Sequence, residues 1–131
     1  MTAPEPCARR ALAVLRVWDH RRARVWAAGE PAALRRLYTA GSRTAARDTA
    51  MLAGYHARGL RVRSMHRQVL ALDVRTCRAD RMSLVVTDRL VDAVAVGHGE
   101  RTGLPPGQAE TRRLDLHRGD AGWLVSEVYE R

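Results

Sequence analysis

A histidine and an aspartate interrupt two apolar stripes in the second half of the sequence. His66 lies among the alternating apolar residues of segment 60–76, and Asp88 lies in the same way within segment 82–96. A buried polar side chain without a partner costs about 1–3 kcal/mol, so such interruptions need a reason. An aspartate beside a histidine orients the imidazole ring and raises its basicity, as in a general base. The pair therefore predicts proton transfer, on the condition that both side chains face one cavity.

The same two residues have a structural interpretation, which we favour at the level of sequence. Asp88 would pair with an arginine, for example Arg22 in the N-terminal segment, and His66 would hydrogen-bond a backbone carbonyl. Structural ion pairs shift pKa values as readily as active sites do. The catalytic assignment of His66 and Asp88 is therefore kept as a hypothesis.

The elements that must position these residues begin with a long helix. Residues 1–7 contain two prolines and predict a disordered tail, followed by a single domain over residues 8–131. Residues 8–28 contain no helix breaker, and their large apolar side chains recur at spacings of three and four. This pattern predicts an amphipathic helix.

Two further helices are expected after a tight corner. Gly29 suits a helix terminus and Pro31 suits the first turn of a short second helix, with Glu30 near the cap. A third helix is predicted over residues 44–58, with Gly59 as its stop.

The chain then alternates with the period of two that is typical of strands. Segment 60–76 predicts one long strand and segment 82–96 a second, paired with it as a hairpin. The apolar side of the first strand is expected to carry Leu60, Val62, Ser64, His66, Gln68, Leu70, Leu72 and Val74. The apolar side of the second is expected to carry Met82, Leu84, Val86, Asp88, Leu90, Val94 and Val96.

The C-terminal third predicts a loop and a last hairpin. Residues 97–108 are rich in glycine and proline and predict a loop, whereas residues 109–118 and 123–130 alternate and are joined by Gly-Asp-Ala-Gly. Helices followed by an antiparallel meander predict an α+β domain, with the helices packed on one face of the sheet.

Two short motifs resemble the nuclear transport factor 2-like superfamily, which includes SnoaL-like polyketide cyclases and ketosteroid isomerases. They are WAAGEPAALRRLY at residues 26–38 and GDAGWLVSEV at residues 119–128. The resemblance implies helices on a curved antiparallel sheet that forms a cone-shaped barrel with a central cavity. Members include isomerases, cyclases, dehydratases and proteins without chemistry, so it implies a cavity and no particular reaction.

The implied cavity suggests a set of ligand-binding residues, namely Trp18, Arg22, Tyr38, Tyr55 and Gln68. A tryptophan can stack on a flat ligand, although core packing is the favoured interpretation. Tyr38 or Tyr55 would donate a hydrogen bond to an oxyanion. Asp19 is three residues before Arg22 and is expected to pair with it as a structural brace. Ketosteroid isomerases use a tyrosine on the first helix, and this chain has none there.

The formal charge of +9 comes from 23 basic residues, all of them arginine, against 14 acidic ones. Lysine, phenylalanine, isoleucine and asparagine are absent, which is typical of a GC-rich coding source. Arginines on the polar side of the predicted strands, Arg61, Arg63, Arg67 and Arg75, could bind a polyanion. No aromatic residues alternate with them, so a solvated face or a homodimer surface is favoured over nucleic-acid binding.

Several classes of site and location are not expected. No group of histidine, cysteine or carboxylate residues has metal-ligand spacing, so neither a metal nor a cofactor is predicted. Cys7 and Cys77 lack the spacing of a disulfide framework, which predicts a reducing compartment. No apolar run approaches the roughly 20 residues of a membrane span, and no secretory signal is recognised, so a cytoplasmic protein without membrane contact is expected.

Three functions follow in order of preference. The first is binding of a small apolar or aromatic molecule without turnover. The second is a cofactor-free isomerase, cyclase or dehydratase of specialised metabolism that uses His66 and Asp88. The third is a polyanion-binding module that uses the arginine-rich sheet face.

Overall fold

The computed structural model describes residues 5–130 and places three helices before all of the strands, as the sequence predicts. The helices are α1 (Glu5–Ala28), α2 (Pro31–Arg35) and α3 (Arg43–Ala57). Of the predicted N-terminal tail, residues 1–4 lie outside the described residues. Residues 5–7 form the first turn of α1, so the prediction of disorder is wrong for them.

The corner after α1 has the predicted chemistry. Gly29 adopts a φ of 70°, in the left-handed region that glycine reaches without a steric penalty. Glu30 is the N-cap of α2 and Pro31 occupies its first turn. Ser42 caps α3 by accepting a hydrogen bond of 3.0 Å from the backbone N–H of Ala45. Gly29 therefore follows the end of α1, and Ser42 caps the start of α3.

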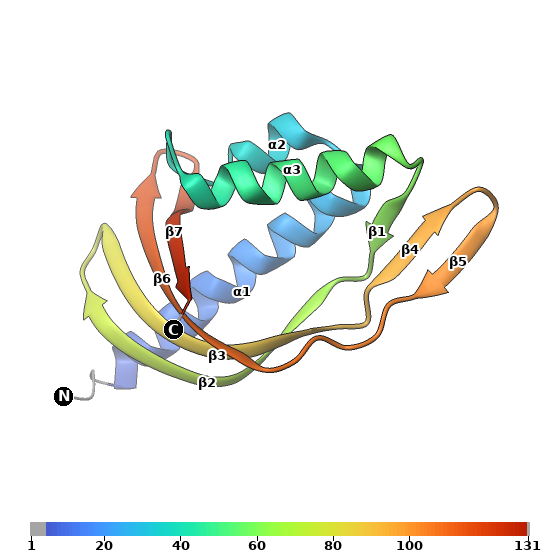
Figure 1. Ribbon diagram of the computed structural model, residues 1–131. Coiled ribbons are helices and arrows are strands. Elements are labelled where there is room, and N and C mark those ends of the chain that lie inside the picture. The colour runs from blue at the N-terminus through green and yellow to red at the C-terminus, as the bar shows by residue number, and fades with distance from the viewer. Residues whose placement is uncertain (1–4, 131) are drawn as a thin grey trace.

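Within the described part of the chain, seven strands form two antiparallel sheets (Figure 1). They are β1 (Arg61–Arg63), β2 (His66–Cys77), β3 (Arg81–Val91), β4 (Val94–Gly97), β5 (Glu100–Gly103), β6 (Glu110–Gly119) and β7 (Gly122–Glu130). The large sheet has the order β2-β3-β6-β7, and the small sheet has the order β1-β4-β5. The predicted long hairpin and the C-terminal hairpin are both present, as β2–β3 and β6–β7.

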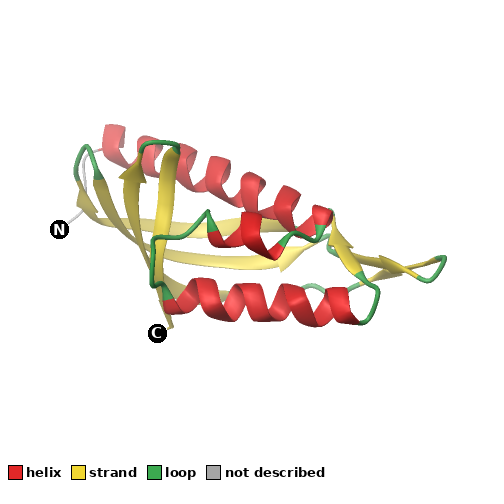
Figure 2. Ribbon diagram, turned by 90° about the horizontal axis from the view of Figure 1, so that it is seen from above, coloured by secondary structure: helices red, strands yellow, loops and turns green. Residues whose placement is uncertain are grey.

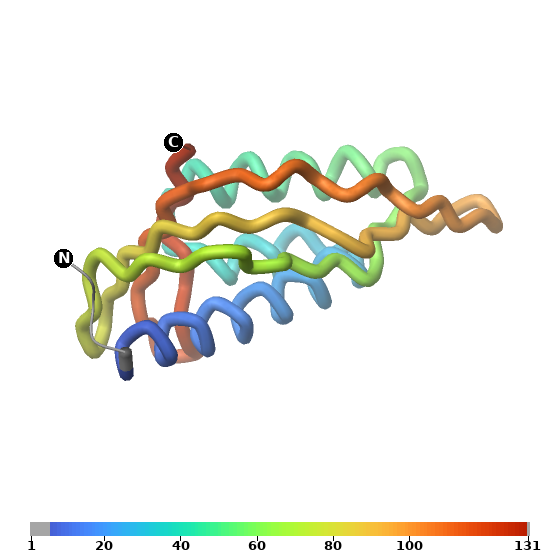
Figure 3. Tube along the Cα trace, turned by 90° about the horizontal axis from the view of Figure 1, so that it is seen from below, coloured from blue at the N-terminus to red at the C-terminus, as the bar shows by residue number. Residues whose placement is uncertain are grey.

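The helices lie on the concave side of the large sheet, which bends upward at its β6–β7 end (Figure 1). Viewed from above, α2 lies between α1 and α3 (Figure 2). Viewed from below, β2, β3 and β6 run side by side across the helices (Figure 3). The core contains fully buried side chains from both layers, including Leu15, Trp26, Leu34, Leu52, Met82, Leu84, Leu116 and Val125. This arrangement confirms the predicted α+β class.

Both strands of the predicted long hairpin are interrupted, which the alternating pattern did not indicate. Ser64 has a φ of 62° and separates β1 from β2, and Asp92 has a φ of 61° and separates β3 from β4. A left-handed residue breaks the extended backbone and changes which face the following side chains occupy. The two breaks divide the hairpin between the large and the small sheet.

The break at Ser64 reverses the predicted faces at the start of β2. Val62 is buried as predicted, but His66 and Gln68 are exposed. Arg67, predicted on the solvent side, is partly buried and lines the interior. The prediction that His66 and Gln68 face inward is therefore wrong.

The second break has the same effect beyond β3. Ala93 and Ala95 are buried there, in place of the predicted Val94 and Val96. Upstream of Asp92, the predicted apolar face of β3 is confirmed.

Two further predictions are corrected. The segment 97–108 is not entirely loop, because residues 100–103 form β5 and pair with β4. Cys7 and Cys77 form a disulfide with a Cα–Cα distance of 6.4 Å, although their spacing did not indicate one. The reason is that α1 begins earlier than predicted and brings Cys7 beside the end of β2.

Among residues 5–130, no helix is long and apolar enough to cross a membrane. The homodimer stays a prediction.

Candidate functional site

A cavity of about 310 Å³ lies between α1, α3 and the concave face of the large sheet. One part of its wall is apolar and is formed by Leu15, Val62, Met65, Leu90, Leu114 and Val128. The other part carries charged side chains from α1, α3, β2, β3 and β6. An apolar cavity with a few convergent polar groups is the usual form of a small-molecule site.

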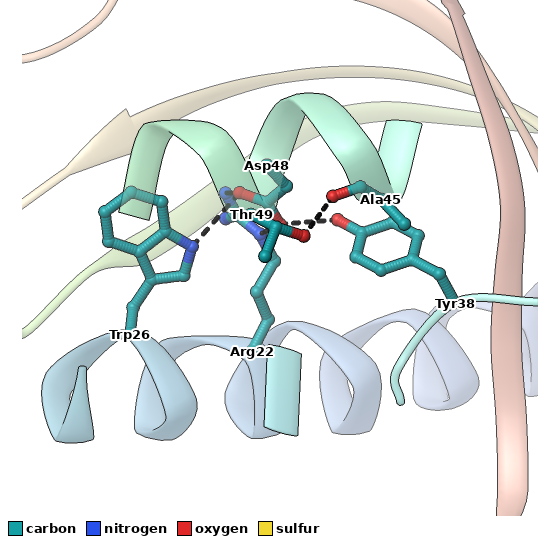
Figure 4. A network of polar contacts seen from close by, with 6 residues as sticks. All are labelled: Arg22, Trp26, Tyr38, Ala45, Asp48 and Thr49. Carbon is teal, nitrogen blue, oxygen red and sulfur yellow. Dashed lines mark hydrogen bonds and ion pairs between the residues drawn. The ribbon is translucent and has the colours of Figure 1, made fainter. Parts of the chain in front are cut away.

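Asp48 on α3 is the centre of one polar network in this wall (Figure 4). Arg22 on α1 donates to both carboxylate oxygens, from Nε to Oδ2 at 2.8 Å and from Nη2 to Oδ1 at 2.7 Å. Trp26 Nε1 donates to Oδ1 at 3.1 Å, and the Tyr38 hydroxyl donates to Oδ2 at 2.6 Å. The network therefore ties α1 and the residues after α2 to α3.

The pKa values in this network show that Asp48 and Arg22 are both charged and form an ion pair. Burial opposes the charge on Asp48, but hydrogen bonds from Arg22 outweigh burial and lower the pKa of the carboxyl. Burial likewise opposes the charge on Arg22, yet Asp48 raises the pKa of the guanidinium. Burial and then the charge of Asp48 raise the pKa of Tyr38, so its hydroxyl stays protonated. These groups form a fixed part of the wall.

Asp88 on β3 is the centre of a second network. Arg112 on β6 donates from Nη2 to Oδ1 at 3.0 Å, and Arg67 on β2 contacts the same oxygen from Nη1 at 3.5 Å. Both arginines are diagonal neighbours of Asp88, since Arg67 pairs with Leu90 and Arg112 pairs with Val86. Asp88 does pair with arginine, as the structural interpretation expected, but Arg22 is not its partner.

Asp19 on α1 also lines the cavity and belongs to neither network. Within residues 5–130 no hydrogen bond or ion pair connects its carboxyl to another side chain, and the predicted brace with Arg22 is replaced by the pair of Arg22 with Asp48. Burial raises the pKa of Asp19 to about 6, although Arg67 and Arg22 act in the opposite direction. A carboxyl with this pKa accepts and releases protons near neutral pH.

Most of the predicted ligand-binding residues do reach the cavity. Trp18, Arg22, Tyr38 and Tyr55 line it. Three of these four side chains already make hydrogen bonds within the protein. Trp18 Nε1 donates to the carbonyl of Leu37 at 2.9 Å, and Arg22 and Tyr38 donate to Asp48. Tyr55 packs edge-on against Trp26, with ring centroids 5.8 Å apart.

The two remaining β2 candidates lie elsewhere. Gln68 faces the outer side and accepts a hydrogen bond from Arg89 at 2.6 Å. His66 lines a second pocket with His20, which Asp19 and Arg67 also line, and it does not line the cavity that Asp88 lines. The expectation that His66 and Asp88 face one cavity is therefore wrong. The cause is the backbone break at Ser64.

The charged residues in the cavity that were not predicted there include Asp19, Arg67 and Arg112. Arg67 was assigned to the solvent face by strict alternation, and Asp19 was assigned to a helix-surface pair. The left-handed backbone at Ser64 has no strong sequence signal, since serine is not a typical left-handed residue. Within residues 5–130 no three histidine, cysteine, aspartate or glutamate side chains are grouped so as to hold a metal ion.

Sequence comparisons find no relatives: no family model and no curated protein matches the chain. Solved structures do match it. The intermembrane space region of the chloroplast protein ARC6 is 19% identical with a TM-score of 0.63, and the match covers 98% of this chain and 100% of that one. A Catenulispora acidiphila protein in complex with S-DNPA is 13% identical with a TM-score of 0.58, covering 92% of each chain.

A third structure describes the shared architecture by name. It is a nuclear transport factor 2-like protein with a cystatin-like fold from Novosphingobium aromaticivorans, 17% identical with a TM-score of 0.50, covering 92% of this chain and 83% of that one. At these identities the likeness concerns the fold. These matches show that the chain has a cystatin-like α+β fold, as the Novosphingobium aromaticivorans protein does.

Proposed function

We propose that this protein binds a small, largely apolar or aromatic molecule in the cavity and transfers a proton on it without a cofactor. Asp19 is the proton-transfer group. The observation that carries this proposal is a cavity-lining carboxyl that no described side chain binds and whose pKa burial raises to about 6. Such a carboxyl is an effective general base or acid near neutral pH. The reaction class is that of an isomerase, cyclase or dehydratase.

The surrounding charges suit this chemistry. The Asp19 carboxylate removes a proton from a carbon next to a carbonyl. The electron pair of the C–H bond forms a carbon–carbon double bond, and the π electrons of the carbonyl group move onto its oxygen. The proton then returns from Asp19 to another atom of the same molecule. Arg67 and Arg112 line the same cavity and stabilise the negative charge that develops on oxygen.

The fold supports the binding part of the proposal. The Catenulispora acidiphila neighbour was solved in complex with S-DNPA. The cavity of this chain, at about 310 Å³, lies at the lower end of the range for small-molecule sites.

A second candidate function is binding without turnover. It is favoured by the Asp48 network, in which Arg22, Trp26 and Tyr38 are all committed to internal hydrogen bonds. Side chains that are held by internal hydrogen bonds stabilise the fold, and they are not free to form new hydrogen bonds with a substrate as it reacts. Under this alternative Asp19 only contacts the ligand.

The test uses 5-nitrobenzisoxazole, a flat probe in which a base removes the ring C–H proton, the N–O bond breaks, and a cyanophenolate forms. We expect the native protein to accelerate this reaction, and Asp19→Asn to reduce the rate to that of buffer. The matched control is Asp73→Asn, because Asp73 is 46% exposed on β2. Asp73→Asn should react like the native protein.

Binding is measured separately, through quenching of Trp18 and Trp26 fluorescence by 2-naphthol, because both tryptophans line the cavity. The non-catalytic alternative would be supported if 2-naphthol quenches the fluorescence of both the native protein and Asp19→Asn, and if the probe reaction has the same rate with both proteins. A rate that survives in Asp19→Asn would contradict the role of Asp19.

A further inference from the structure

The two networks in the cavity wall differ in how fully their arginines are paired. Arg22 and Asp48 neutralise each other through two hydrogen bonds. In the second network, Arg67 and Arg112 share the single carboxylate of Asp88, and both contact the same oxygen. This network therefore has one positive charge more than it has negative charges.

Arg112 shows this surplus at the level of single atoms. Its Nε is buried and has no hydrogen-bond partner within the described residues. Its side chain is only 18% exposed, so bulk water does not replace the missing partner well. A guanidinium has five N–H donors in a planar fork, and the contact of Arg112 with Asp88 uses one nitrogen, Nη2.

The positive charge of Arg67 is also only weakly paired. Its one contact with Asp88 is long, at 3.5 Å. Burial and then the nearby positive charge of Arg112 lower the pKa of its guanidinium, despite the attraction of Asp88 and Asp19. A second anion between Arg67 and Arg112 would relieve the repulsion and supply the missing acceptor.

We propose that the ligand of this cavity is a monocarboxylic acid with an aromatic body of about two rings, whose carboxylate binds between Arg67 and Arg112. This inference rests on the proposed function, because it takes the cavity to be a ligand site. A carboxylate matches the planar guanidinium fork and can accept a hydrogen bond from Arg112 Nε, which has no partner among the described residues. The apolar body of the acid packs on Leu90 and Leu114, which line the cavity on the neighbouring strand positions.

The test compares 2-naphthoate with its neutral analogue 2-naphthamide, using tryptophan fluorescence and calorimetry at neutral pH. We expect the native protein to bind the acid about tenfold more tightly than the amide, or better. Arg112→Gln and Arg67→Gln should each remove most of this preference and leave the affinity for the amide nearly unchanged. Arg75→Gln is the matched control, because the Arg75 side chain is 50% exposed on the same strand as Arg67.

Each outcome separates this inference from the proposed function. Equal affinity for the acid and the amide in the native protein overturns the carboxylate assignment and leaves the proposed cavity function standing. A preference for the acid that persists in both arginine variants overturns the assignment to Arg67 and Arg112. Binding of neither probe overturns both the ligand site and this inference. Circular dichroism of the two variants shows whether each is folded, and either folded variant decides the question.

Discussion

Arg22 on α1 and Asp48 on α3 form a paired contact in the wall of the cavity, with Nε–Oδ2 at 2.8 Å and Nη2–Oδ1 at 2.7 Å (Figure 4). Trp26 and Tyr38 donate to the same carboxylate. Asp48 thus accepts hydrogen bonds from three other residues. The pair fixes the separation of α1 and α3 and removes Arg22 from the groups that can bind a ligand.

Replacing Asp48 should strongly destabilise the protein. We expect Asp48→Ala to lower the free energy of unfolding by about 3–5 kcal/mol, because it leaves the buried guanidinium of Arg22 without a counter-charge. Urea denaturation followed by circular dichroism measures this. Asp73→Ala is the control, since Asp73 pairs with Arg75 at 3.2 Å and their side chains are 46% and 50% exposed, so the loss should amount to about 1 kcal/mol or less. Equal losses in the two variants would contradict a structural role for the network.

Asp19 should make the protein less stable as the pH rises. Its pKa is raised from 3.8 to about 6 in the folded state, so between these values the folded protein binds more protons than the unfolded one. The free energy of unfolding contributed by this group is therefore fully present below about pH 4 and is lost as the pH rises through about 6. A difference of this size corresponds to about 3 kcal/mol at most.

The variant Asp19→Asn checks this direction, because asparagine resembles the protonated carboxyl. We expect Asp19→Asn to be more stable than the native protein at about pH 8 and equally stable at about pH 4, as measured by urea denaturation. In the probe reaction, the rate of the native protein should rise with pH through about 6, as Asp19 loses its proton. A variant that is less stable at the higher pH would show that Asp19 has a favourable partner in its charged form.

The disulfide should contribute measurably to stability. Cys7 and Cys77 join the start of α1 to the end of β2 across 70 residues of chain. Arg10 donates to the carbonyls of Arg78 and Ala79 at the same place, at 2.9 and 3.0 Å. We expect reduction with dithiothreitol to lower the free energy of unfolding by about 2–5 kcal/mol.

The double variant Cys7→Ser with Cys77→Ser is the control for this prediction. It should be as unstable as the reduced native protein and should not respond to dithiothreitol. If reduction leaves the unfolding midpoint of the native protein unchanged, the bond does not stabilise the fold. Mass spectrometry after thiol alkylation shows directly whether the bond is present.

The adjacent residues His66 and Arg67 test the change of face at the start of β2. His66→Gln should leave both the probe-reaction rate and naphthoate affinity unchanged, because His66 is exposed and lies outside the cavity. Arg67→Gln should weaken naphthoate binding by about tenfold or more, because Arg67 lines the cavity. The two assays are the same for both variants. A loss in His66→Gln with none in Arg67→Gln would mean that strict alternation continues through Ser64.

Local signals in the sequence were sufficient for much of the fold. The spacing of apolar residues predicted α1 and α3, and Gly29, Glu30 and Pro31 predicted the corner between the first two helices. Alternation predicted the hairpins β2–β3 and β6–β7. These features depend on residues close together in the chain, so periodicity and capping preferences report on them directly.

The candidate site was predicted only in part, because its geometry depends on backbone breaks and long-range partners. The sequence identified the cavity wall around Trp18, Tyr38, Tyr55 and Asp88, since these are large or polar side chains on apolar stripes. It assigned His66 to the interior because alternation takes no account of an interruption within a strand.

By itself, the sequence determined the α+β class, the order of helices and strands, and the apolar face of β3. Only the tertiary structure decided that Arg67 enters the cavity, that Arg22 binds Asp48, and that no side chain among residues 5–130 pairs with Asp19. The physical reason is that each charged group is stabilised by whichever opposite charge lies within a few ångströms. That distance is set by a left-handed residue and by packing between helix and sheet, and neither follows from the local pattern.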